Sequence, residues 1–165
     1  KTIVCLSPHA SEMFKIIYPK ITDFPDIEVK TFIELVWEKR HLLPPIKYEY
    51  PVVIHDSCRM ARELGIAEEY RDILDTIGVN YIEAYRNKKW TTCCGGPNKM
   101  LFGEISKIIA SRRVAELEDT GAKKALISCP YCVSALENGL ENNTSIDMED
   151  IVEFLYRGYE GNARF

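Results

Sequence analysis

Five of the six cysteines in this chain fall into three groups that lie far apart in the sequence. Thirty-four residues separate Cys58 from the adjacent pair Cys93 and Cys94, and another 34 separate that pair from Cys129, which is soon followed by Cys132. Thiolate sulfur is the soft ligand that zinc ions and iron–sulfur clusters select. Five sulfurs are one more than a tetrahedral zinc site uses, so the pattern indicates a cluster. A fold that serves this pattern must bring the three groups to one place.

Apolar, β-rich runs alternate with stretches of helical periodicity along the whole chain. The expected strands are residues 3–6, 52–55, 81–84 and 125–128, with shorter ones at 28–29 and 145–146. The expected helices are residues 31–40, 67–77, 99–119, 131–140 and 149–156. This alternation predicts an α/β fold with a largely parallel sheet that helices cover.

The beginning of the chain resembles its last third. The segment Ser7–Ala10 follows an apolar strand and opens a helix, as the segment Cys129–Cys132 does. Further on, residues 27–36 match residues 146–155 in their apolar and acidic positions. The sheet is therefore expected to be built from a partial and a complete βα repeat, with the boundary near residue 46. In the first copy, a serine and an alanine stand where the second copy has cysteines.

Each cysteine group is placed after a strand. Cys58 follows the strand at 52–55 and Cys129 follows the strand at 125–128, while the Cys93–Cys94 pair comes between the strand at 81–84 and the next helix. Ligand sites in parallel α/β sheets collect beyond the carboxyl ends of the strands. We therefore expect the three groups to meet at one edge of the sheet.

The residues beside the cysteines suit thiolates. Pro130 is typical of a first helical position, which places Cys129 at the cap of a helix, where free N–H groups and the helix dipole favour a thiolate. Gly95 and Gly96 allow a tight turn and expose amide donors to sulfur. The adjacent cysteines cannot easily chelate one tetrahedral ion but can bridge neighbouring metals, which favours iron over zinc.

Two alternatives remain open on the residues alone. Four of the five cysteines could hold a structural zinc ion in a non-catalytic interaction domain. The Cys129–Cys132 segment also resembles the glutaredoxin active site, so dithiol–disulfide exchange at Cys129 and Cys132 is a further hypothesis. Such a dithiol is expected near the start of its fold, whereas Cys129 lies 36 residues from the end of this sequence.

Three residues near these motifs are considered separately. His55, three residues before Cys58, is either an ordinary half-buried histidine or a donor or proton source close to the centre. Cys5, inside an apolar strand, is expected to be a small buried side chain and not a ligand. His9, in the first copy, is expected to have no role. No catalytic residue is assigned.

Arg59 and Lys99 flank cysteine groups. Each could offset the negative charge of a thiolate-ligated centre, bind an anionic substrate, or be a solvated surface charge. Trp90, just before the second cysteine group, could either shield the site from water or take an ordinary packing role.

Composition excludes some partners. The net charge is -4, the pI is near 5.5 and no basic stripe is present, which argues against nucleic acid. No run of apolar residues is long enough to span a membrane, and no secretory leader is visible. We therefore expect a cytoplasmic protein, in whose reducing surroundings cysteines serve more often as ligands than as disulfides.

Together the motifs resemble the CCG cysteine-rich domain family. This family includes catalytic subunits of heterodisulfide reductase and iron–sulfur subunits of glycolate, lactate and glycerol-3-phosphate oxidation systems. The resemblance rests on His55–Arg59, Cys93–Pro97 and Cys129–Cys132 and extends over residues 50–157. On this reading, a complete CCG domain at 46–165 follows the tail of a degenerate first CCG repeat at 1–45.

The resemblance implies that Cys58, Cys93, Cys94, Cys129 and Cys132 all bind one 4Fe–4S centre of the non-cubane type. It implies part of an oxidoreductase that takes electrons from a flavin or ferredoxin-type partner subunit and passes them to a disulfide, a quinone-linked carrier or another subunit. Attachment to a membrane would come through a partner. Family members usually carry two such domains, but Ser7 and Ala10 replace the first CxxC here, so we expect a single centre.

Overall fold

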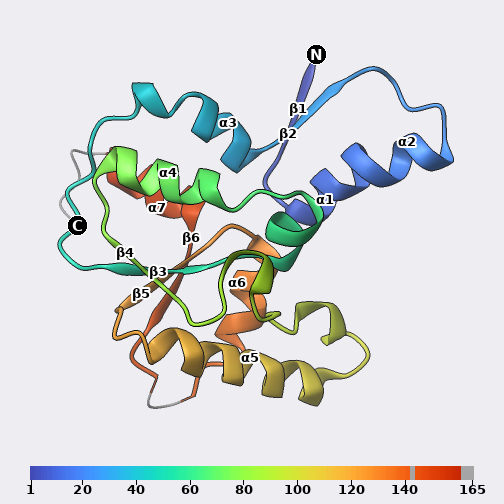
Figure 1. Ribbon diagram of the computed structural model, residues 1–165. Coiled ribbons are helices and arrows are strands. Elements are labelled where there is room, and N and C mark those ends of the chain that lie inside the picture. Colours follow the sequence, from blue (N-terminus) through green and yellow to red (C-terminus); the bar gives the residue numbers. More distant parts are fainter. Residues whose placement is uncertain (142–143, 161–165) are drawn as a thin grey trace.

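A four-stranded parallel sheet carries the three cysteine groups (Figure 1). The computed structural model describes residues 1–141 and 144–160. Within them the strand order of this sheet is β4-β3-β5-β6, with β3 at Val52–His55, β4 at Tyr81–Glu83, β5 at Lys124–Ile127 and β6 at Asp147–Asp150. Every neighbouring pair in it is parallel. The predicted α/β class with a parallel, helix-covered sheet is confirmed.

Helices cover both faces of this sheet (Figure 1). On one face lie α3, α4 and α7, which span Phe32–Glu38, Glu68–Ile77 and Ile151–Tyr159. On the other face lie α5 and α6, which span Gly103–Glu118 and Pro130–Glu137. The central strand β3 serves both layers, because Val52 and Ile54 pack in the first core and Val53 in the second. Successive side chains of a strand point to opposite faces, so a strand between two helical layers must be apolar throughout.

A smaller part of the chain lies beside this sheet. It contains a two-stranded parallel sheet and a helical run, in which β1 is Thr2–Cys5, β2 is Glu28–Thr31, α1 is Pro8–Glu12, a π-helical turn is Met13–Ile17 and α2 is Tyr18–Ile21. Single turns elsewhere are Arg40–Leu42, Arg59–Glu63, Lys88–Trp90 and Gly96–Asn98. No helix in residues 1–141 and 144–160 combines the length and the apolar character that crossing a membrane requires.

The order of elements is shared by the two ends of the described chain. β1 pairs in parallel with β2, and α3 follows β2, just as β5 pairs with β6 and α7 follows β6. The helices are also capped at the same point, since the side chains of Thr31 and Asp150 each accept a hydrogen bond from the first turn. This likeness agrees with a partial and a complete repeat, and the assignment of domains at 1–45 and 46–165 stays a prediction.

The last strand and helix lie further along the chain than the sequence pattern places them. The pattern predicts a strand at 145–146 and a helix at 149–156, whereas β6 and α7 begin two residues later. The Asp150 carboxylate accepts a hydrogen bond from Val152 N at 2.8 Å, which makes Asp150 the cap of α7. Lys124 of β5 forms ion pairs with Asp147 and Glu149, the two acidic residues of β6 that precede Asp150. These cross-strand pairs stabilise a strand whose charges resemble those of a helix surface.

The turn that follows α6 approaches α5 closely at Gly139. A Cβ at this position would lie 2.6 Å from the backbone carbon of Ala110 and 2.7 Å from the backbone nitrogen of Ser111. Since both atoms belong to the backbone of α5, a side chain at Gly139 could only be accommodated by moving a helix.

We predict that Gly139→Ala lowers the free energy of unfolding by about 1–3 kcal/mol, the usual cost of overpacking. Gly103→Ala is the matched control, because nothing lies within 4 Å of its Cβ position and alanine favours the helix that starts there. The control should be neutral or stabilise by about 0.4–1 kcal/mol. Urea unfolding curves of both variants measure these changes, and equal values for the two would contradict the close approach.

Candidate metal centre

The three cysteine groups meet beyond the carboxyl end of the four-stranded sheet. Cys58 precedes the π-helical turn after β3, and Cys93 and Cys94 lie on the connection between β4 and α5. Cys129 is the N-cap of α6, with Pro130 at the start of the helix, as the sequence predicts. The structure thus brings together residues from three strand ends.

The five sulfurs form one continuous series. Each thiol lies close enough to the next to shift its pKa, in the order Cys58, Cys93, Cys94, Cys132 and Cys129. Cys94, Cys129 and Cys132 are buried, whereas Cys58 and Cys93 are partly exposed. The series therefore has a closed end inside the protein and an open end at its surface.

Backbone amides point at the two central thiols. Gly95 N donates to Cys93 Sγ at 3.3 Å, and Gly96 N donates to Cys94 Sγ at 3.4 Å. Gly95 has a φ of +81°, and a Cβ on it would lie 2.6 Å from the carbonyl oxygen of Ser106. Only glycine fits this turn, and the turn supplies the amide donors that stabilise thiolate sulfur.

Contacts between the thiols separate their pKa values. Hydrogen bonding from the Cys58 thiol lowers the pKa of Cys93 to about 2, and the same contact raises the pKa of Cys58. At the other end, the Cys132 thiol lowers the pKa of Cys129 to about 6, while the pKa of Cys132 is raised by Cys129. Each thiolate therefore lies next to a thiol that can share its proton with it. Metal ions bind to such a site by displacing these protons.

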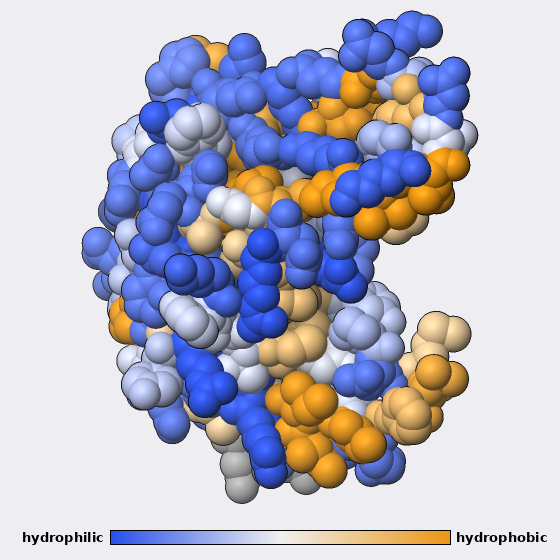
Figure 2. All heavy atoms as spheres, turned by 45° about the vertical axis from the view of Figure 1, so that its right-hand side comes forward, coloured by the Kyte–Doolittle hydropathy of each residue, from blue (hydrophilic) through white to orange (hydrophobic). Residues whose placement is uncertain are grey.

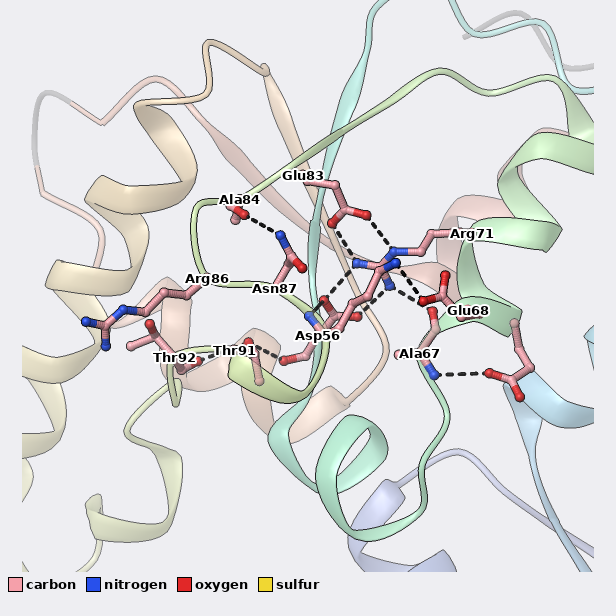
Figure 3. Close-up of polar contacts among 12 residues, drawn as sticks. Asp56, Ala67, Glu68, Arg71, Glu83, Ala84, Arg86, Asn87, Thr91 and Thr92 are labelled. Atoms are coloured by element: carbon pink, nitrogen blue, oxygen red, sulfur yellow. Dashed lines mark hydrogen bonds and ion pairs between the residues drawn. The ribbon is translucent and has the colours of Figure 1, made fainter.

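A buried carboxylate holds the connection that carries the second cysteine group (Figure 3). Both oxygens of Asp56 accept hydrogen bonds from the guanidinium of Arg71, at 2.8 and 2.9 Å, and the same guanidinium pairs with Glu83. Asp56 Oδ2 also accepts from Lys88 N at 2.6 Å, and its backbone oxygen accepts from Thr91 Oγ1 at 2.8 Å. Asp56 therefore links the end of β3, the helix α4 and the β4–α5 connection.

Helix α5 holds this connection from the opposite side. The Glu116 carboxylate accepts hydrogen bonds from Arg86 N at 2.7 Å and Thr92 Oγ1 at 3.1 Å. Arg113, one turn earlier, forms an ion pair with Glu116 at 2.8 Å and donates to the carbonyl oxygen of Arg86 at 3.0 Å. The segment before Cys93 is thus fixed at both of its sides.

His55 lies behind the sulfurs and is fully buried. Its Nδ1 accepts a hydrogen bond from Arg113 Nε at 3.1 Å. Burial, reinforced by the cation of Arg113, lowers the pKa of His55 to about 3, so the ring is neutral. A ring nitrogen of His55 and the sulfurs of Cys94 and Cys132 all lie within 4.8 Å of one another.

The charged and aromatic residues that flank the cysteine groups lie outside the sulfur series. Arg59 donates to both carboxylate oxygens of Glu12 in α1, at 2.7 and 2.8 Å, so its charge is neutralised across the two parts of the chain. Lys99 lies at the surface and contacts Ser134 Oγ at 3.3 Å. Trp90 is 74% exposed, so its ring is not packed in the core, and Lys89 Nζ lies 5.6 Å from its ring centroid.

Two of the expectations concern the first part of the chain. Cys5 is buried in β1 and lies apart from the series of five sulfurs, as expected. His9, for which no role is expected, packs its ring edge-to-face against Tyr131, with ring centroids 5.8 Å apart. Helix α1 therefore forms a wall beside the first turn of α6.

The open side of the molecule is hollowed (Figure 2). In Figure 1, α1 and α2 lie above this side, and the segment that precedes α5 lies below it. Tyr131 lies between α1 and the lower segment. Its ring contacts His9 in α1, and its Cδ1 lies 3.0 Å from the position that a Cβ of Gly96 would take. The lower segment presents Met100 and Leu101, which are 88% and 81% exposed. The hollow thus has an apolar lower rim.

Sequence reasoning misses the polar residues that position the cysteines. Asp56 lies inside the first cysteine motif, but the motif gives it no function. A carboxylate directly after a buried apolar strand does indicate that a cationic side chain is paired with it. Arg71, Arg113 and Glu116 lie on helices with many other charges, and no signal in the sequence separates them from surface residues.

The family comparison matches the same part of the chain. The family described as "CCG: Cysteine-rich domain" matches residues 52–137, which are slightly more than half of the 165 residues. The chain belongs to the CCG cysteine-rich domain family. The matched residues contain all five sulfurs of the series.

Among similar proteins is one subunit of the dihydromethanophenazine:CoB–CoM heterodisulfide reductase of Methanosarcina acetivorans, 28% identical over 78% of this chain and 32% of the relative. The EtfAB:quinone oxidoreductase of Syntrophomonas wolfei is 26% identical over 97% of this chain and 24% of the relative. The probable iron-sulfur-binding oxidoreductase FadF of Bacillus subtilis is 27% identical over 98% and 24%. This CCG chain therefore spans about a quarter to a third of the length of these relatives.

We predict that Arg71→Met lowers the free energy of unfolding by about 3–5 kcal/mol, because it leaves the Asp56 carboxylate buried without its partner. Glu68→Gln, on the same helix, is the control. Glu68 pairs with Lys88 at the surface and is 67% exposed, so its loss should change stability by about 1 kcal/mol or less. Urea unfolding measures both values. A loss in Arg71→Met as small as in the control would show that the buried pair does not hold the site.

Proposed function

We propose that this CCG chain holds one 4Fe–4S centre of the non-cubane type and acts as the electron-carrying part of an oxidoreductase of the heterodisulfide-reductase type. The ligands would be Cys58, Cys93, Cys94, Cys129 and Cys132. The observation that carries this proposal is that the five sulfurs gather beyond one edge of the sheet, where each thiol shifts the pKa of the next.

The arrangement of the sulfurs fits a cluster better than a single ion. The adjacent residues Cys93 and Cys94 turn to different neighbours, Cys58 on one side and Cys132 on the other. Each of the two also has its own amide donor. One tetrahedral ion would leave at least one of these sulfurs without a metal, whereas a centre with several metals uses all five.

When bound, the centre would store and release single electrons. The contribution of the protein is to hold the five sulfurs, to supply N–H donors from Gly95 and Gly96, and to keep three of the ligands away from water. The partly exposed thiols Cys58 and Cys93 mark the side from which an electron donor or acceptor can approach.

The relatives supply the context of the reaction. Their names describe part of a heterodisulfide reductase and a quinone oxidoreductase, which supports electron transfer from a flavin or ferredoxin-type partner subunit to a disulfide or a quinone-linked carrier. Cleavage of one disulfide to two thiols consumes two electrons and two protons, so a single centre must act in two successive one-electron steps. The apolar rim at Met100 and Leu101 would meet such a partner or carrier.

A zinc-stabilised interaction domain is the second candidate. It is favoured by the close grouping of His55, Cys94 and Cys132. It is disfavoured by Arg113, which occupies one nitrogen of His55, and by the sulfurs of the series that such a site leaves unused. Dithiol exchange at Cys129 and Cys132 is weaker, because these thiols are 0% and 2% exposed and an incoming disulfide could not reach them.

Anaerobic reconstitution with iron and sulfide tests the proposal. The wild-type chain should bind about four irons and about four sulfides and give a cluster EPR signal. We predict that Cys58→Ala loses most of this iron and sulfide. Cys5→Ala is the matched control, since Cys5 is buried in β1 outside the series, and it should keep the full count.

Three results would decide against a cluster. One tightly bound zinc without sulfide in the wild-type chain supports the interaction domain instead. Equal loss of iron in Cys58→Ala and Cys5→Ala points to general damage to the fold. Disulfide exchange that survives in Cys58→Ala but disappears in Cys129→Ala supports the dithiol alternative.

A further inference from the structure

We propose that His55 is a positioning residue that donates a hydrogen bond from Nε2 to a sulfur of the metal centre, on the side of Cys94 and Cys132, and thereby raises the reduction potential of the centre. The inference rests on the proposed function, since it concerns a sulfur of the bound cluster or of its ligands.

The first step is the position of the proton on the imidazole. Arg113 Nε donates to His55 Nδ1 at 3.1 Å. A guanidinium has donors but no acceptor, so Nδ1 must present its lone pair to Arg113. The neutral ring therefore carries its proton on Nε2. Arg113 itself is 0% exposed and is held by Glu116 and the carbonyl oxygen of Arg86, so it cannot turn away.

The second step is the missing partner of this proton. His55 is 0% exposed, and within residues 1–141 and 144–160 its Nε2 has no hydrogen-bond partner. Buried N–H groups without a partner are rare in folded proteins. The polar atoms grouped with the ring nitrogen of His55 are the sulfurs of Cys94 and Cys132, within 4.8 Å. Because Arg113 holds Nδ1, we assign the free N–H on Nε2 to the side of Cys94 and Cys132, at the closed end of the sulfur series.

The third step excludes a role for His55 as a metal ligand. A ligand nitrogen must present a lone pair to the metal. If Nε2 did so, the proton would move to Nδ1 and face the N–H of Arg113. Because Arg113 cannot accept it, the ring is restricted to donation from Nε2. Cys94 and Cys132 can bind the metal, while His55 stabilises the negative charge on their side of the centre.

A hydrogen bond to sulfur stabilises the reduced, more negative state of a cluster more than the oxidised state. Loss of the donor should therefore make the centre harder to reduce. We expect His55→Leu to raise the ratio of oxidised to reduced centre at a fixed potential roughly tenfold, a fall of about 59 mV for a one-electron couple.

The experiment compares the midpoint potentials of reconstituted variants in EPR-monitored redox titrations. His55→Leu removes the donor. His55→Gln keeps an N–H donor and an oxygen that can accept from Arg113, and it should retain most of the wild-type potential. His41→Leu is the control, because His41 is an exposed histidine on the turn after α3. It should leave the potential unchanged.

A second measurement uses no redox activity. The ¹⁵N chemical shifts of labelled histidine in the metal-free chain report which ring nitrogen of His55 carries the proton. We expect protonation at Nε2. This measurement also covers the case in which His55→Leu fails to fold or to hold a cluster.

The results separate this inference from the proposed function. An unchanged potential in His55→Leu, or equal shifts in His55→Leu and His55→Gln, would overturn the role as a donor. So would a proton on Nδ1, or a metal bound to Nε2. If the wild-type chain holds only zinc, the proposed cluster function fails. In that case an Nε2 proton in the zinc-loaded chain still supports donation to sulfur.

Discussion

The buried carboxylate of Asp56 is the contact on which the candidate metal centre depends. It lies directly after β3, two residues before Cys58, and it binds the guanidinium of Arg71 from α4 with both oxygens. The same residue accepts hydrogen bonds from Lys88 and Thr91 of the connection that leads to Cys93. A charge in this position is stable only because it is fully paired. The pairing therefore sets the distance between the first and second cysteine groups.

Much of this architecture can be predicted from the sequence, because it depends on patterns that are local. The strands before Cys58 and Cys129 are continuous apolar runs. Because the carboxyl ends of parallel strands lie at the same edge of a sheet, the cysteines that follow them are placed together. The contacts of Arg113 cannot be predicted in this way. It stands next to Arg112 in a helix rich in charge, and only the packing of α5 on the sheet decides that one of the two arginines is buried. The pattern misplaces the start of α7 for a related reason, since the acidic residues of β6 are paired across strands.

The first part of the chain, before the four-stranded sheet, contributes to the surroundings of the cysteine groups. Glu12 of α1 binds Arg59, the neighbour of Cys58, and His9 packs on Tyr131 between Cys129 and Cys132. Residues beside Ser7 and Ala10 thus form a wall next to Cys58 and the first turn of α6. Interpreted as a degenerate repeat, this segment has exchanged metal binding for contact with its neighbour.

The two-sided attachment of the β4–α5 connection also bears on how such chains can vary. Asp56 and Glu116 fix residues 86–92 from opposite sides, so one inserted residue there would break several hydrogen bonds at once. The segment around Met100, beyond Cys94, is exposed, and Met100 and Leu101 are 88% and 81% accessible. Selection can therefore reshape the surface that a partner meets while the interval between cysteines is kept. The interval between the first and second cysteine groups of this chain is then held by polar contacts of the polypeptide, whatever metal the sulfurs bind.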